Sequence, residues 1–153
     1  MVLASEIPVG HTPKGGWEDE MPPPILAGCT EPLAPGVVDM RGLWKAYAVE
    51  VDGQPLDDIS HVERIEQCGN RVVITAGGIV HDMVCDGTLD NGVNDVSGFT
   101  GESVSVAATW KDGKHVLRPN NEGIAVTREM GGDELIWTLV PLKRVTHMHR
   151  VAE

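Results

Sequence analysis

The sequence predicts an all-β protein, an antiparallel up-and-down barrel of about eight to ten strands that follows an extended N-terminal arm. Three observations lead to this prediction. Short runs rich in Val, Ile and Thr recur at roughly ten-residue spacing after residue 37. The spacers between these runs contain Gly, Asn and Asp, which suit tight hairpin turns. The loops are short, so consecutive strands should be neighbours and the sheet should close on itself.

The first 37 residues differ in composition from the rest and contain seven of the ten prolines. Proline lacks a backbone N–H and fixes φ, so neither a helix nor a central strand suits this segment. We expect an extended Pro/Gly-rich arm over 1–37, anchored only by Trp17, Ile25 and Leu26, and a barrel domain over 38–153. Removal of residues 1–30 should then leave the β-fold intact.

The predicted strands alternate with turn sequences along the whole domain. In chain order they are 42–51, 61–68, 71–76, 79–85, 92–98, 103–110, 114–119, 124–130, 134–140 and 144–151. Only residues 54–67 leave room for one or two helical turns. A β-sandwich is the alternative architecture, but its Greek-key connections usually need a long crossing loop, and none follows residue 60.

Length and charge narrow the functional classes. The chain of 153 residues fits one domain. Its net charge of −11 argues against nucleic acid and against an anionic membrane surface as partners. The sequence contains no apolar run of about 20 residues, so we expect no transmembrane helix. The N-terminus lacks the basic start and apolar stretch of a signal peptide.

The cysteine content favours a reducing compartment. Cys29, Cys68 and Cys85 form an odd set without a CxxC pair, and Cys68 and Cys85 lie in strand-like runs that suit small core residues. We therefore expect no disulfide framework and a cytoplasmic location.

The first and last strands resemble those of the calycin superfamily, which comprises lipocalins and intracellular fatty-acid-binding proteins. Gly42 and Trp44 match the Gly-x-Trp that opens the first strand of these barrels. In the fatty-acid-binding branch an Arg-x-Tyr on the last strand holds a ligand carboxylate, and the matching positions here are His147 and His149. The two helices of that branch do not fit after residue 51, so the resemblance implies a ligand-binding barrel without naming the ligand.

The last strand, "RVTHMHRV", raises the question of which face points inward. His147 and His149 share parity with Val145 and Val151, which predicts two imidazoles that face the barrel interior and contact a ligand. In the alternative, the other face points inward, with Thr146, Met148 and Arg150. A third interpretation is a metal site completed by His81 or Asp82, since His-x-His is a known ligand spacing. We expect no metal.

Other strands place polar groups among apolar neighbours. His81 shares a face with Ile79, Met83 and Cys85, and Arg128 shares one with Ile124 and Val126. Glu63 shares parity with Ile65 and could pair with Arg128 or act as a general base. The predicted ligand contacts are Trp44, His81, Trp110, Arg128, Trp137, His147 and His149. The candidates for a catalytic role are His81, His147, His149 and Glu63.

The function predicted from these residues is binding of a small hydrophobic or amphipathic molecule in a barrel cavity with His and Arg anchors. The alternative is an enzyme on the same barrel that does acid–base chemistry on a small organic substrate, of the cyclase, isomerase or hydratase/lyase type. A third class is an interaction module that uses the N-terminal arm. We expect no cofactor, and a homo-oligomer is left open.

Overall fold

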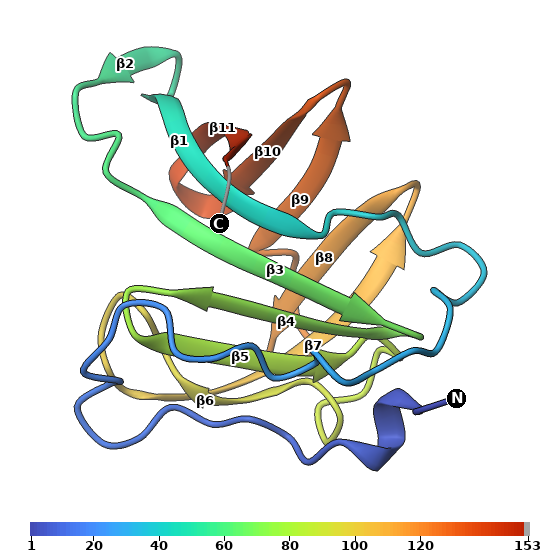
Figure 1. The fold of residues 1–153 in the computed structure, drawn as a ribbon. Helices are drawn as coiled ribbons and strands as arrows, with labels where there is room; N and C mark the ends of the chain where they lie inside the picture. The colour runs from blue at the N-terminus through green and yellow to red at the C-terminus, as the bar shows by residue number, and fades with distance from the viewer. Residues whose placement is uncertain (152–153) are drawn as a thin grey trace.

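A computed structural model describes residues 1–151, and in it eleven strands form one antiparallel sheet that curls into a nearly closed barrel (Figure 1). The predicted all-β fold class is confirmed. The last two residues of the predicted domain, 152 and 153, lie outside the described residues. Within residues 1–151, no helix is long and apolar enough to cross a membrane.

The strands are short and follow one another through tight connections. They are β1 (Gly42–Val51), β2 (Gln54–Leu56), β3 (Val62–Cys68), β4 (Arg71–Ala76), β5 (Ile79–Val84), β6 (Val93–Val96), β7 (Ser103–Lys111), β8 (Lys114–Pro119), β9 (Val126–Gly131), β10 (Glu134–Leu139) and β11 (Arg144–Val151). Two 3₁₀ turns, η1 (Ala4–Glu6) and η2 (Val140–Leu142), complete the described elements. Residues 54–67, where helical turns had room, contain β2 and most of β3 instead.

The barrel closes through its first long strand. β1 pairs with β3 on one side and with β11 on the other, and the order along the sheet is β5-β4-β3-β1-β11-β10-β9-β8-β7-β6. The seam lies between β5 and β6, where the amide of Val84 bonds the carbonyl of Asn91 but no ladder forms within residues 1–151. The short loops make sequence neighbours into sheet neighbours, as expected for a meander.

Turn and bulge residues set which side chains face inward. The Asp52–Gly53 and Asp112–Gly113 turns have positive φ at both positions, which is the backbone of a type I′ hairpin. In β1 the register shifts between Ala46 and Ala48, so Tyr47 forms a bulge. As a result Ala46 and Val49 are both buried, although their spacing breaks the alternation.

The N-terminal segment, residues 1–41, contains no strand and lies against the outer face of β3 to β5 (Figure 1). This contact buries a second apolar cluster outside the barrel, made of Ala4, Leu26, Cys68, Val73 and Val80. The cluster explains why β4 is buried on both faces. Of the expected anchors, Leu26 is buried, whereas the side chain of Trp17 is exposed.

Polar contacts join the same segment to the barrel. The carboxylate of Glu66 accepts from the amides of Ile25 and Leu26, and Arg64 donates to the carbonyl of Pro22. Arg71 is buried and donates to the carbonyls of Ala4, Ile7 and Pro8. Removal of residues 1–30 would leave these buried groups without partners, so the structure argues against the expectation that the fold tolerates it.

The cysteine prediction is wrong for two of the three residues. Cys29 and Cys68 form a disulfide that ties the N-terminal segment to the end of β3, while Cys85 is free and buried. No spacing pattern marks this pair, because the two cysteines lie 39 positions apart in different layers. Disulfides persist in oxidising compartments, so the expected cytoplasmic location loses its main support.

Candidate functional site

The barrel interior contains a cavity of about 420 Å³. Its wall is mostly apolar, with side chains from both sides of the barrel that include Ile74, Ile79, Met83, Val93, Val104, Val106, Leu117, Val126 and Leu139. Four ionisable residues also line it: His61, Glu63, His81 and Arg128. Fully buried Trp44, Leu135 and Met148 fill other parts of the interior and do not line the cavity.

A buried ion pair crosses the interior beside the cavity. Glu63 comes from β3 and Arg128 from β9, and three strands separate β3 from β9 along the sheet. Nε of Arg128 donates to Oε2 of Glu63 at 2.8 Å, and Nη2 donates to Oε1 at 3.1 Å. Glu63 is fully buried, and Arg128 is 5% exposed. This bidentate geometry is the strongest form of an Arg–carboxylate contact.

Glu63 is held as a carboxylate. Burial alone would raise its pKa, but the charge of Arg128 and the hydrogen bonds from His61 and Arg128 outweigh burial and lower the pKa to about 2. Glu63 therefore cannot take up a proton near neutral pH. It is a poor general base and a good orienting group.

His61 sits next to Glu63 on the cavity wall. It lies just before β3, two residues from Glu63, and its Nε2 is 2.7 Å from Oε1 of Glu63. Its ring packs against Trp137 with centroids 4.7 Å apart. The side chain is 27% exposed, so His61 contacts both the buried carboxylate and the solvent. Phe99, which is 68% exposed in the β6–β7 loop, also lines the cavity.

His81 lines the cavity from β5, which is separated from β3 by one strand, β4. Its Nε2 lies 2.7 Å from the carbonyl oxygen of Val96, so this nitrogen carries the proton. Burial lowers its pKa below the ordinary value, and the hydrogen bond to Val96 only partly opposes this shift. His81 is therefore neutral at physiological pH.

A row of polar residues crosses four neighbouring strands on the inner face. Trp110, His115, Arg128 and Trp137 are successive cross-strand partners on β7, β8, β9 and β10. Within residues 1–151, the indole nitrogens of Trp110 and Trp137 and both ring nitrogens of His115 are buried without a hydrogen-bond partner. Burial lowers the pKa of His115 to about 3, and the charge of Arg128 adds to the shift. Buried polar atoms of this kind usually have a partner, such as a water or a ligand.

The structure brings some of the predicted site residues together. Glu63, His81, Arg128 and Trp137 line the cavity, and the suggested pairing of Glu63 with Arg128 is present. Trp110 faces the interior next to His115, with ring centroids 5.3 Å apart, but does not line the cavity. Trp44 is fully buried and donates from its indole nitrogen to the carbonyl of Met40, so it is a packing residue.

The predicted inward orientation of His147 and His149 is wrong. Thr146 and Met148 are the buried residues of β11, and Met148 lies opposite Ala46 and Leu135 on the inner face. Arg150 shares their parity but sits near the end of the strand, where its guanidinium covers the ring of Trp44 at 4.6 Å and stays exposed. This face can therefore point inward without burying the charged end of Arg150.

On the outer wall the two histidines contact polar and aromatic side chains. Nδ1 of His147 is 3.0 Å from Glu134, and the ring of His149 stacks on Tyr47 with centroids 3.9 Å apart. His81 faces the interior and Asp82 is engaged with Arg71, so the suggested metal site does not assemble. In residues 1–151, no three His, Cys, Asp or Glu side chains meet in a metal-binding arrangement.

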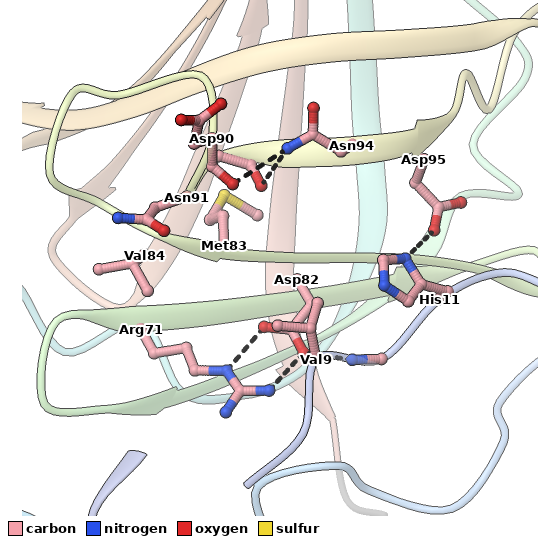
Figure 2. A pocket seen from close by; sticks show the side chains of 12 residues that line it. Val9, His11, Arg71, Asp82, Met83, Val84, Asp90, Asn91, Asn94 and Asp95 are labelled. Carbon is pink, nitrogen blue, oxygen red and sulfur yellow. Dashed lines mark hydrogen bonds and ion pairs between the residues drawn. The ribbon is translucent and has the colours of Figure 1, made fainter. Parts of the chain in front are cut away.

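A second hollow, of about 220 Å³, lies between the N-terminal segment, β5 and the β5–β6 connection (Figure 2). Its two most buried carboxylates, Asp82 and Asp95, are already engaged. Asp82 bonds Arg71 and the amide of Gly10, and Asp95 accepts from the amide of Thr12 and lies 3.3 Å from His11. Asp82, named above as a possible metal ligand, instead neutralises the buried Arg71.

Sequence reasoning missed three residues of the interior. His61 shares parity with Glu63 two residues later, so the alternation that identified Glu63 could also have identified it. His115 could have been found from its parity with Leu117 in "KHVLRP". No local pattern marks Phe99, because its position at the cavity depends on how its loop folds over the barrel end.

Comparison with known proteins adds no relative. No family model matches the chain, and no curated protein matches it. Only the geometry of the cavity therefore points to a function.

Proposed function

We propose that the barrel binds a small hydrophobic or amphipathic molecule in its interior cavity. The observation that supports this most is a cavity of about 420 Å³ with a mostly apolar wall and a few convergent polar groups. Ligand sites typically have volumes of about 300–1,000 Å³ and this mixture of lining groups. The nearly closed meander also resembles the calycin barrels, and we propose a calycin-like ligand-binding role on that basis.

Calorimetric titration with a matched series of ten-carbon compounds tests this function. We expect 1:1 binding of at least one of 2-decanone, 1-decanol and decanoate. Val126→Trp would place a large ring in the cavity and should abolish binding. Glu129→Trp, on the outer face of the same strand, is the matched control, because Glu129 makes only a surface ion pair with Lys114. If none of the three compounds binds, or if Val126→Trp binds as well as the unchanged protein, the proposal is rejected.

The second candidate function is acid–base catalysis in the same cavity. The specific observation in its favour is the 2.7 Å contact between His61 and the permanently ionised Glu63. A carboxylate in this position orients an imidazole and stabilises its protonated form, as in hydrolytic triads. His61 would then remove a proton from a carbon or oxygen of a bound substrate.

A simple probe reaction can test this candidate. Ring opening of 5-nitrobenzisoxazole begins when a base removes its carbon-bound proton, and the product is coloured. We expect His61→Ala to abolish any rate above that of buffer, while His11→Ala, outside the barrel, should leave the rate unchanged. A rate in the unchanged protein no higher than in His61→Ala would reject His61 as a general base.

A further inference from the structure

The charges on the cavity wall bear on which class of ligand the cavity can accept. In fatty-acid carriers of the kind that the barrel resembles, an arginine is available to neutralise a ligand carboxylate. Here Arg128 is already neutralised by Glu63 through two hydrogen bonds. The other ionisable residues on the wall are His61, which contacts Glu63, and His81, which is engaged with a backbone carbonyl. Hence, among residues 1–151, no cation on the cavity wall lacks a counter-ion.

The same wall retains hydrogen-bond donors without acceptors. A guanidinium has five N–H groups, and Arg128 uses two of them on Glu63. Within residues 1–151 its Nη1 has no protein acceptor. The indole N–H of Trp137 is buried and unpartnered, and the Arg128 guanidinium lies 5.2 Å from the centre of the Trp137 ring. Both residues line the cavity, next to each other in the sheet.

We propose that the cavity selects an uncharged ligand whose polar end is a hydrogen-bond acceptor, such as a ketone, ester or amide, and that Arg128 and Trp137 donate to that acceptor. This inference rests on the proposed ligand-binding function and specifies its ligand class. A carbonyl oxygen could accept from both donors while adding no net charge to a low-dielectric interior. A carboxylate would bring a second negative charge close to Glu63 without a free cation to balance it.

A matched ligand pair measures this selectivity directly. At pH 7.5, 2-decanone and decanoate have chains of similar length and differ in the charge of the polar end. We expect the dissociation constant of the full-length protein for 2-decanone to be at least tenfold lower than that for decanoate. If decanoate binds equally well or more tightly, the selectivity is wrong while the ligand-binding function stands. If neither these two compounds nor 1-decanol binds, both proposals fail.

Two variants distinguish the contribution of the Trp137 N–H donor from that of the Glu63 charge. Trp137→Phe keeps an aromatic ring but removes the N–H, so 2-decanone should bind several-fold more weakly, with little change for decanoate. Glu63→Gln removes the counter-ion of Arg128, so the preference should move towards decanoate by at least tenfold. If Glu63→Gln does not fold, the Trp137→Phe variant still tests whether the N–H of Trp137 binds the ligand. An unchanged ratio of the two dissociation constants in Trp137→Phe would overturn the role of its N–H.

Discussion

One buried arginine–carboxylate pair lies outside the barrel and a second lies inside it, and the two pairs differ in what surrounds them. Arg71 and Asp82 pair on the outer face, beneath the N-terminal segment, and Arg128 and Glu63 pair inside, beside the cavity. Both pairs are bidentate, and all four residues are at most 5% exposed. The chemistry of the pairs is therefore the same, and only their neighbours distinguish them.

The difference lies in the remaining donors. Arg71 uses all five N–H groups, two on Asp82 and three on the carbonyls of Ala4, Ile7 and Pro8. Arg128 uses two of its N–H groups on Glu63, and its side chain lines the cavity. A saturated arginine fastens one layer of the protein to another, whereas an unsaturated one can bind an additional molecule. The outer pair is thus structural, and the proposed function makes the inner pair part of the binding site.

Of the changes that test this difference, truncation of the N-terminal segment should reduce stability most. Deletion of residues 1–30 removes three acceptors of Arg71, one half of the disulfide and the apolar cover of Val73 and Val80. We expect the free energy of unfolding to fall by about 5 kcal/mol, or cooperative unfolding to disappear. Urea denaturation followed by circular dichroism measures this. A truncated protein of unchanged stability would show that the outer pair does not fasten the segment.

Replacing both members of a pair by apolar residues should reduce stability less than truncation does. The loss should be larger for the outer pair than for the inner pair. Arg71→Met/Asp82→Leu leaves three carbonyls and the amide of Gly10 without partners, so we expect a loss of about 3 kcal/mol. Arg128→Met/Glu63→Leu leaves only His61 without its partner and should change stability by about 1 kcal/mol or less, while 2-decanone binding is lost. Equal losses of stability from the two double variants would contradict the distinction.

Acid should destabilise the interior through its neutral histidines. Folding lowers the pKa of His115 to about 3, from about 6.5 in an unfolded chain. Between these values the unfolded chain binds a proton that the folded chain does not, so stability falls as pH falls. From pH 7.5 to 5 we expect a loss of about 2 kcal/mol, to which His81 adds in the same direction. The Glu63 carboxylate does not contribute in this window, because its pKa is lowered and its stabilisation is lost only as pH falls towards 2.

Denaturation curves at the two pH values test this effect. His115→Leu should show a smaller loss between pH 7.5 and 5, because the variant lacks that proton site. His11→Leu is the matched control, since the side chain of His11 is 60% exposed, and it should keep the full loss. A pH dependence in His115→Leu equal to that of the unchanged protein would mean that His115 is not buried in its neutral form.

The sequence allowed the strands and part of the interior to be predicted, because alternation and turn residues are local signals. The parity of Glu63 with Ile65 and of Arg128 with Val126 was enough to place both residues on the inner face. Local signals did not determine the orientation of β11, because it depends on the packing of Met148 opposite Ala46 and Leu135 on other strands. The disulfide and the outer pair depend on where the N-terminal segment lies, and no periodic pattern in that segment indicates this.

The most direct test of the binding account is the indole N–H region of a two-dimensional ¹H–¹⁵N NMR spectrum during titration with 2-decanone. The four tryptophans differ. Trp17 is exposed, and the indole N–H of Trp44 donates to the carbonyl of Met40. The indole nitrogens of Trp110 and Trp137 are buried and have no hydrogen-bond partner within residues 1–151. Trp→Phe variants assign the four signals. We predict that the Trp137 signal shifts downfield with saturation at one equivalent, while those of Trp17 and Trp44 stay in place. A titration that moves only Trp17, or none of the four signals, would contradict a ligand site in the barrel interior.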